Sequence, residues 1–441
     1  MRTLLACSAA GVALAVLGLP SSGGILGQER SSRDPEVLTR GPIHEAFAQP
    51  VIRRPGSPPV VPRRPPEPVP ELPPEQKPAG ADVQWIPGYW AWEDEREDFV
   101  WVSGLWRDEP PGRRWVPGYW HQTDEGWAWV PGYWGPDDQT EVPLYPVPPD
   151  PIPEAVAPAP AEDSYYVPGC WVFQRQQYWW RPGFWLGYRP GWVWTPARYF
   201  LTPAGYVFND GFWDHDFHRR GLLFAPALIG PQLLAQPGFS YRPSYALYGD
   251  FLLGSLFTRV AGGRYYFGDY YRPGYAAQGF VPWIDYRIGD RFQDPIYSYY
   301  RWQNRNEPRW DNQLRSVYAG RRDGKLPVPP RTLSQQKQVV GGNAIKIGAP
   351  VNQWRGGNIK LQQVTNVQIA DHRREANQFR LMSQNRRESE TRAQAAATGT
   401  APISIKVDAP KGKTRRTTAK PPPAPTMPKF QGKPVPPQFK G

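Results

Sequence analysis

A short aromatic motif recurs along the chain and constrains its fold more than any other feature. The motif is tryptophan, two residues, glycine, one residue and tryptophan, as in Trp85-Ile86-Pro87-Gly88-Tyr89-Trp90. Copies begin at residues 85, 101, 115, 129 and, beyond a Pro-rich bridge, at 166, 180, 194 and 208. So short a period holds one strand and one loop, so a four-stranded propeller blade per copy is excluded.

Each copy has the composition of a β-strand. Aromatic and β-branched residues crowd the copies, and polar stretches such as 121–126 separate them. Consecutive strands joined by short loops run antiparallel. We therefore predict a mainly β fold, an antiparallel meander of short aromatic strands in two four-copy blocks, residues 83–142 and 163–213.

The Pro-Gly pair inside each strand predicts a kink, because proline lacks the N–H that the ladder needs. Two tryptophans five positions apart face opposite sides of a straight strand. A bulge at Pro-Gly would bring them to one face. The alternative is a tight Pro-Gly turn that makes each copy the tip of a hairpin.

Composition separates this aromatic region from its flanks. The chain of 441 residues has 56 Pro and 43 Gly, yet 14% aromatic residues, which disordered chains lack. We predict disordered Pro-rich arms, a linker over 28–82 and a basic tail over 398–441, and a Pro-rich bridge over 143–162 between the two blocks. Within the first arm, the apolar residues 42–48 are expected to dock on the folded part.

Two further regions complete the chain. Residues 214–335 stay rich in Tyr and Arg without the period, and we expect them to pack on the second block. Residues 336–397 are polar, and a stretch free of Pro and Gly predicts one C-terminal helix from about 360. Its apolar stripe is weak, which favours a solvated helix.

The N-terminus has the pattern of a secretory signal peptide, residues 1–27. Arg2 precedes an apolar stretch from Leu4 to Leu19, and small residues follow. Cleavage is expected in the region of Pro20, Gly24 and Gly27. We therefore expect an exported protein in the periplasm, at the cell surface or outside the cell.

Removal of the signal leaves one cysteine, Cys170, which cannot form an internal disulfide. Its place in the motif, where other copies carry Tyr or Phe, favours a small apolar substitute in a packed strand. A reactive thiol is the alternative, and no nearby Lys or His cluster supports it.

The net charge of +12 is uneven, with an acidic first block and a basic tail. For an exported chain, this charge suggests contact with an envelope polymer, a glycan or another envelope protein, and with an anionic surface through the tail. The tail could equally be basic for solubility alone. Export argues against nucleic acid, and the oligomeric state is open.

Catalytic and metal-binding patterns are sparse. The candidates for metal ligation are Asp214, His215, Asp216 and His218, but no second cluster completes a shell, so we expect a solvated loop and no metal. The acidic run 93–98 matches no calcium loop and favours a hairpin loop. No nucleophile elbow, phosphate loop or zinc-protease helix occurs. We expect no catalytic residue and no cofactor.

The motif aromatics are the remaining candidates for a binding site. Exposed rings stack on flat ligands such as sugars, whereas buried rings form the core of a thin sheet, which we favour for most of them. The candidates are Trp85, Tyr89, Trp90, Trp101, Trp106, Trp115, Tyr119, Trp120, Trp129, Tyr133, Trp134, Trp171, Trp180 and Trp185.

The copies resemble the WXXGXW (or YXWGXW) repeat family of exported bacterial proteins. The resemblance covers about residues 85–213, and the last two copies depart from it, with Ala197 in place of Gly and Phe208 in place of Trp. It implies export and a repeat architecture but no reaction, and no catalytic residue is carried over.

Three hypotheses about function follow. The leading one is a non-enzymatic exported envelope protein whose aromatic repeats serve structure or interaction. The second is a carbohydrate-binding module that uses exposed Trp and Tyr. The third is an enzyme activity within 214–335.

Overall fold

The structure is a computed structural model of the chain. It describes residues 34–80, 83–289, 291–339, 345–356, 359–396, 403–406 and 420–437. The predicted signal peptide 1–27, with Pro20, Gly24 and Gly27, lies outside the described residues, as does the stretch 407–419 of the basic tail.

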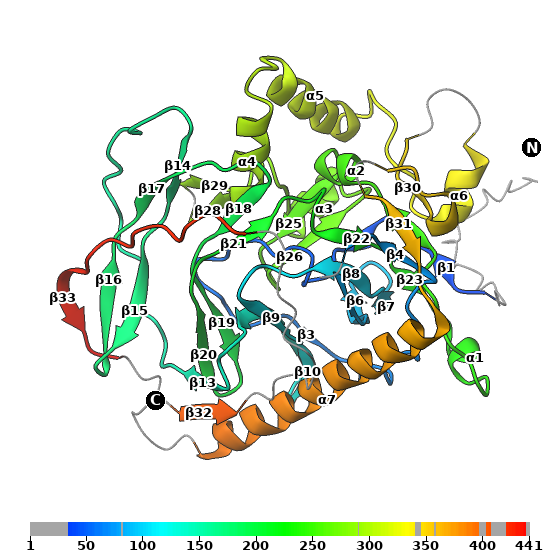
Figure 1. Cartoon of the computed structure of the whole chain (residues 1–441), viewed down its shortest axis with the longest axis horizontal. Helices are drawn as coiled ribbons and strands as arrows, with labels where there is room; N and C mark the ends of the chain where they lie inside the picture. The colour runs from blue at the N-terminus through cyan, green and yellow to red at the C-terminus, as the bar shows by residue number, and fades with distance from the viewer. Residues whose placement is uncertain are drawn as a thin grey trace, which may run out of the picture.

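Each copy of the motif forms two short strands that are interrupted around its glycine position, which confirms the predicted kink (Figure 1). The first four copies form β5 (Val83–Ile86), β6 (Tyr89–Glu93), β7 (Asp98–Val102), β8 (Leu105–Asp108), β9 (Arg113–Val116), β10 (Tyr119–Thr123), β11 (Gly126–Val130) and β12 (Tyr133–Pro136). The other four form β14 (Ser164–Val167), β15 (Cys170–Gln174), β16 (Gln177–Arg181), β17 (Phe184–Gly187), β18 (Trp192–Thr195), β19 (Arg198–Thr202), β20 (Gly205–Asn209) and β21 (Phe212–His215).

Neighbouring copies pair two by two into long kinked hairpins. In hairpin 1 (83–108), β6 pairs with β7 and β5 with β8. The same pattern forms hairpin 2 (113–136), hairpin 3 (164–187) and hairpin 4 (192–215). The mainly antiparallel β architecture is thus confirmed, but each four-copy block is divided into two hairpins.

The division arises because strands from outside the repeats take the free edges. β8 pairs on its other side with β22 (Gly221–Leu223), whereas β9 pairs with β12. Pro110 and Pro111 lie between β8 and β9, where they have no N–H to extend a ladder. The expected continuous meander therefore does not form.

Ring pairs across each hairpin explain the two tryptophans of the motif. The first Trp of one copy lies opposite the last ring of its partner copy, so Trp85 pairs with Trp106 and Trp90 with Trp101, with ring centroids 5.1 and 5.2 Å apart. Edge-to-face pairs of this kind contribute about 0.5–1.5 kcal/mol beyond the area that they bury. The other hairpins repeat them in Trp115–Trp134, Trp120–Trp129, Trp171–Trp180 and Trp194–Trp213.

The two rings of one copy do not share a cluster. Trp85 and Trp106 pack with Leu222, whereas Trp90 and Trp101 pack with Val69. The bulge that would bring both to one face is therefore wrong. Because the strands are interrupted, the rings at the two ends of a hairpin pack in separate hydrophobic clusters.

Glycine is required at the kink because a ring of the partner copy closes over its backbone. A Cβ on Gly104 would lie 2.5 Å from Trp85 Cζ2 and 2.6 Å from the carbonyl oxygen of Ile86. A Cβ on Gly132 would lie 2.4 Å from Trp115 Cζ2. Such distances lie far inside van der Waals contact, so any larger residue forces the hairpin apart.

The described part of the first Pro-rich arm, residues 34–80, packs against the hairpins. Residues 34–80 include β1 (Glu36–Val37), β2 (Gly41–Pro42), β3 (Val60–Val61) and β4 (Gln76–Pro78). Ile43, Ala46 and Phe47 are buried, so the docking of residues 42–48 is confirmed. Thin aromatic hairpins expose wide apolar faces, and these arms cover them.

Strands of the bridge region and of the tail also pair with each other and with the hairpins. β13 (Glu141–Leu144) pairs with β32 (Ile403–Lys406), and β33 (Gln431–Val435) adds to β16. The strands β32 and β33 of the tail are therefore held by pairing, while residues 398–402 and 407–419 lie outside the described residues. The edge strands of the hairpins present N–H and C=O groups with which these segments can pair, and composition alone does not predict such pairing.

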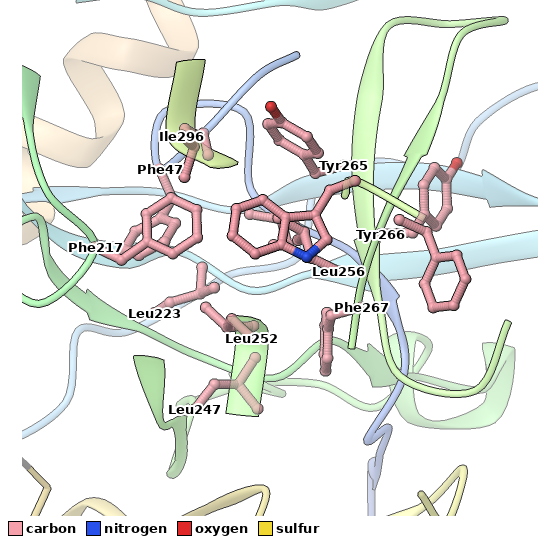
Figure 2. Close-up of a cluster of buried hydrophobic side chains, with 14 of the residues drawn as sticks. Phe47, Phe217, Leu223, Leu247, Leu252, Leu256, Tyr265, Tyr266, Phe267 and Ile296 are labelled. Carbon is pink, nitrogen blue, oxygen red and sulfur yellow. The ribbon is translucent and has the colours of Figure 1, made fainter. Parts of the chain in front are cut away.

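Residues 214–335 pack on both blocks and form most of the main core, which Figure 2 shows around Phe47, Phe217 and Tyr265. Their elements are β22, β23 (Ala227–Leu228), α1 (Pro231–Leu234), β24 (Tyr245–Leu247), α2 (Gly249–Leu253), β25 (Leu256–Arg259), β26 (Arg264–Phe267), α3 (Pro273–Ala277), β27 (Phe280–Pro282), β28 (Arg287–Ile288), β29 (Phe292–Gln293), α4 (Pro295–Gln303) and α5 (Trp310–Arg322).

The predicted C-terminal helix is α7 (Asn366–Ala396), which starts six residues after the expected position. It follows α6 (Leu333–Gln338), β30 (Gly348–Pro350), η1 (Val351–Gln353) and β31 (Leu361–Gln363). Figure 1 shows it lying along hairpins 1 and 2. Phe379 and Met382 are buried although Val367 and Leu381 are exposed, so the helix is docked rather than solvated.

Gly104→Ala should lower the free energy of unfolding by about 1–3 kcal/mol, because the new methyl group meets Trp85 and the Ile86 carbonyl. Urea unfolding followed by tryptophan fluorescence measures this loss. Gly274→Ala in α3 is the matched control, since nothing lies within 4 Å of its Cβ. Equal stability of the two variants would contradict this account of the motif glycine.

Candidate binding site on the repeat hairpins

A buried carboxylate lies at the kink of hairpin 1. Glu71 comes from the Pro-rich segment 67–76 and accepts hydrogen bonds from the main-chain N–H groups of Gly88 (2.8 Å) and Gly104 (3.0 Å). The indole of Trp101 donates a third bond of 2.8 Å. The two kinks would otherwise leave these N–H groups buried without ladder partners, which is costly. Glu71 therefore completes the hairpin.

Hairpin 3 uses the same arrangement with a different segment. Glu154, from the bridge segment 150–157, accepts from the main-chain N–H groups of Gly169 (2.9 Å) and Gly183 (2.6 Å). Arg53 Nη2 lies 4.0 Å from the same carboxylate. The recurrence shows that a carboxylate between two glycine N–H groups belongs to the repeat design.

Hairpin 2 takes its carboxylate from the docked residues 42–48. Glu45 accepts from the main-chain N–H of Gly132 (3.0 Å) and from the indole of Trp129 (2.9 Å). Arg264 pairs with it at 3.1 Å. Three separate segments thus deliver one glutamate each to three hairpins.

The covering segments also accept hydrogen bonds from motif indoles. Trp90 donates to the main-chain carbonyl of Glu67 and Trp106 to that of Gln76, each at 2.9 Å. In hairpin 3, Trp171 donates to the carbonyl of Asp150 (2.9 Å) and Trp185 to that of Ala157 (3.1 Å). One carbonyl lies before the glutamate and one after it. Polyproline backbone suits this role because it forms no internal hydrogen bonds, so its carbonyls can accept from an indole, although Gln76 also begins β4.

Hairpin 4 departs from the arrangement as its sequence does. Ala197 replaces one motif glycine, and Gly211 N–H donates to the side chain of its own neighbour Asp210 at 2.7 Å. The indole of Trp213 still donates to a proline-rich segment, at the carbonyl of Pro423 (3.3 Å). This segment, in the described part of the tail, carries no glutamate between 420 and 437.

Burial raises the pKa of Glu71 to about 7, against the opposing effect of the three N–H donors and Arg380. The carboxyl of the unfolded chain titrates near pH 4.5. Between these values the folded protein binds more protons than the unfolded one. Stability contributed by Glu71 is therefore fully present below about pH 4.5 and falls as the pH rises to about 7.

The motif aromatics that were candidates for exposed stacking are mostly core. Half-buried are Tyr89, Trp120 and Trp185. Buried are Trp85, Trp90, Trp101, Trp106, Trp115, Tyr119, Trp129, Tyr133, Trp134, Trp171 and Trp180.

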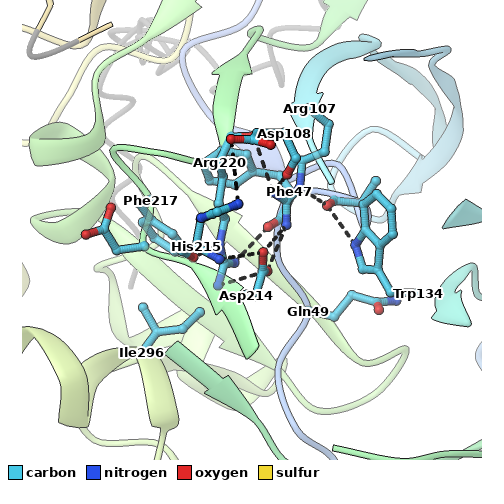
Figure 3. Close-up of polar contacts among 12 residues, drawn as sticks. Phe47, Gln49, Arg107, Asp108, Trp134, Asp214, His215, Phe217, Arg220 and Ile296 are labelled. Carbon is cyan, nitrogen blue, oxygen red and sulfur yellow. Dashed lines mark hydrogen bonds and ion pairs between the residues drawn. The ribbon is translucent and has the colours of Figure 1, made fainter. Parts of the chain in front are cut away.

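The four candidate metal ligands enter different contacts, which Figure 3 shows around Asp214 and His215. Both carboxylate oxygens of Asp214 accept from Arg107 Nη2, at 2.6 and 2.8 Å, and Arg220 pairs with it at 3.1 Å. His215 is buried, which lowers its pKa to about 4. In the part of the chain that the structure describes, no three His, Cys, Asp or Glu side chains are grouped to hold a metal ion.

The remaining two are also engaged. Asp216 accepts from Tyr299 Oη at 3.1 Å, and His218 lies 3.1 Å from Asp250. The predicted solvated loop is therefore wrong for Asp214, His215 and Asp216, which are buried. Arg107 of hairpin 1 and Arg220 of the same loop neutralise Asp214. The sequence places Arg219 and Arg220 directly beside this loop, whereas Arg107 lies far away in sequence.

Two smaller predictions have mixed outcomes. The acidic run 93–98 does form the turn of hairpin 1, but Arg40 pairs with Glu93 (3.1 Å) and Glu95 (2.8 Å), so it is less solvated than expected. Cys170 starts β15, and burial raises the pKa of its thiol. A raised pKa disfavours the thiolate, in agreement with a packing role.

A cavity of about 420 Å³ opens between hairpins 1 and 2. Its walls include Trp90 of hairpin 1, Trp120 of hairpin 2 and Arg380 of α7. Small-molecule and peptide sites have volumes of about 300 Å³ and more, so this space is large enough for a ligand.

The sequence prediction missed Glu45, Glu71 and Glu154. A signal was present, because an apolar residue, proline and glutamate stand in both Val69-Pro70-Glu71 and Ile152-Pro153-Glu154. Each triplet lies in a Pro-rich segment that directly precedes a pair of copies. Reading these segments as spacers concealed the recurrence.

Glu71→Gln should remove the pH dependence of stability that Glu71 contributes, because an amide does not titrate and resembles the protonated carboxyl group in shape and in carrying a donor. The free energy of unfolding of the variant, relative to that of the unmodified protein, should therefore rise as the pH rises from about 4.5 to about 7. Urea unfolding across this range measures this change. The exposed Glu162→Gln is the control; an unchanged pH profile in Glu71→Gln would refute the burial argument.

Comparisons with known proteins agree with the hairpin as the unit. The family model described as WXXGXW repeat (2 copies) matches residues 82–107, 112–134 and 189–214. These segments correspond to hairpins 1, 2 and 4, while hairpin 3 has the same pairing outside them. No curated protein and no solved structure matches the chain. Among the described residues no helix is long and apolar enough to cross a membrane. Residues 82–107, 112–134 and 189–214 are thus WXXGXW repeats, and in each of them one kinked hairpin holds the two copies that the family model describes.

Proposed function

We propose that this protein is an exported, non-enzymatic protein of the cell envelope whose repeat hairpins serve as an interaction module. One observation carries the proposal: hairpins 1, 2 and 3 each bind a separate peptide segment through glycine N–H groups and indole N–H groups. A scaffold that holds three separate peptide segments by a glutamate on its glycine N–H groups and by carbonyls on its indoles is suited to bind polypeptide.

The use of polar groups supports a non-enzymatic role. In 214–335, Asp294 accepts from the main-chain N–H groups of Ile296 and Tyr297 at the start of α4, and from Tyr265 Oη. Arg315 binds Asp285 and Asp311. These contacts hold elements together. The charged groups thus serve packing, as expected of a structural region.

Carbohydrate binding is the second candidate. The half-buried rings of Tyr89 and Trp120 line the 420 Å³ cavity, and aromatic rings stack on sugar faces. Retention of the purified protein on immobilised polysaccharides tests this idea. Retention that Trp120→Ala abolishes, with Trp185→Ala as the matched control, would favour the carbohydrate role over polypeptide binding.

Export can be tested with a fusion of the full chain to alkaline phosphatase, which is active only after translocation. The fusion should be active, and Leu14→Arg with Leu17→Arg should abolish activity by breaking the apolar stretch. Thr3→Arg is the control, since a positive charge before that stretch suits a signal peptide. Recovery of the unmodified protein in the cytosol would overturn the proposal.

A further inference from the structure

A second cavity, of about 180 Å³, lies between hairpins 3 and 4. Hairpin 3 contributes Trp171 and Trp180 to its wall, and hairpin 4 contributes Tyr199 and Tyr206. Prolines of the first arm and of the bridge complete the wall. Apolar cavities of about 150 Å³ are known to hold a molecule of the size of benzene. The space between hairpins 3 and 4 is therefore large enough for a ligand built on one ring.

Arg198 also lines this cavity and is only 7% exposed. Its Nη atoms donate to the main-chain carbonyl of Pro50 (2.7 Å) and to the side-chain amide oxygen of Gln49 (2.8 Å), which are both neutral. Its Nε–H is buried without a hydrogen-bond partner, and among the described residues its guanidinium makes no ion pair. Glu45, which acts on it from a distance, pairs with Arg264 at 3.1 Å. A buried cation in this situation is costly unless an anion compensates it.

The pKa of Arg198 agrees with this view. Burial lowers it to about 10, because neighbouring groups offset only part of the cost of removing the guanidinium from water. An anion bound beside the guanidinium would act in the opposite direction. The apolar surroundings of Arg198 thus favour a charged partner.

Arg53 brings a second guanidinium to the wall, and its Nε–H is also buried without a hydrogen-bond partner. Its Nη2 lies 4.0 Å from Glu154. Arg54 pairs with Asp150, the one carboxylate in the wall, at 3.2 Å. The thiol of Cys170 lines the same space, and burial raises its pKa, so it supplies no negative charge. Three arginines thus stand against two carboxylates, which leaves one positive charge for a ligand.

We propose that the cavity between hairpins 3 and 4 binds a small organic monocarboxylate built on a single ring. The carboxylate would accept from the Nε–H groups of Arg198 and Arg53, since guanidinium groups bind carboxylates with charge-assisted hydrogen bonds. The ring would pack against the aromatic side chains of the wall, such as Trp180 and Tyr199. This site goes beyond the interaction role proposed above and depends on neither export nor a peptide partner.

Isothermal titration calorimetry of the purified full-length protein with sodium benzoate and with sodium glucuronate tests the site. At least one of the two acids should bind saturably, and the tighter one shows whether the ring is aromatic or a sugar. Benzamide and glucose are the neutral counterparts and should bind at least about tenfold more weakly, because they lack the charge that the arginines bind. Binding of neither acid would overturn the proposal, as would equal binding of an acid and its neutral counterpart.

Two variants test the arginines themselves. Arg198→Met keeps an apolar side chain of similar length but removes the guanidinium, and it should weaken binding of the acid by about tenfold or more. Arg53→Met should act in the same direction, and it keeps the test decisive if Arg198→Met does not fold, since Arg53 is less buried.

The matched control is Arg175→Met, in the exposed turn of hairpin 3, which should bind the acid as the unmodified protein does. Acid binding that Arg198→Met and Arg53→Met both retain would contradict the assigned contacts. Inorganic phosphate serves as a further probe. Phosphate that binds as tightly as the organic acid would also overturn the proposal, because phosphate carries no ring.

Discussion

The fold depends on which acceptors bind the main-chain N–H groups that the kinks leave without a strand partner. A break at the glycine position in both strands of a hairpin turns two main-chain N–H groups toward one point, as Gly88 and Gly104 turn toward Glu71. A single carboxylate has the acceptor capacity for both. In hairpins 1, 2 and 3 the acid comes from outside the hairpin, on the covering segment. The packing of the first arm and of the bridge follows from that arrangement.

The sequence predicted the local structure well and the long-range structure poorly. Strand composition, loop positions and the kink were readable from the copies, because neighbours along the chain determine them. The role of Glu71 could not be read from the sequence, since its partners Gly88 and Gly104 lie 17 and 33 residues away. Proline-rich composition is also typical of spacers. The same holds for Asp214, whose partner Arg107 lies 107 residues away.

The aromatic rings have two uses in the recurring hairpin geometry. Rings in cross-strand pairs, such as Trp85 and Trp106, are fully buried and stabilise the hairpin itself. Indole N–H groups at the hairpin ends hold the covering peptide. One tryptophan thus supplies apolar area and a directed donor, which phenylalanine cannot. This double use accounts for tryptophan rather than phenylalanine at Trp90, Trp106 and Trp171.

The source of each covering segment sets an order in which the hairpins can be completed during synthesis. Glu45, Glu71 and Glu154 all precede the hairpins that they cap, so their hairpins close as soon as the strands emerge. Hairpin 4 is completed late, because Trp213 meets Pro423 only after 210 further residues. Until the end of translation, the indole N–H of Trp213 can therefore bind other extended chains. Loss of the last residues would leave that N–H permanently open.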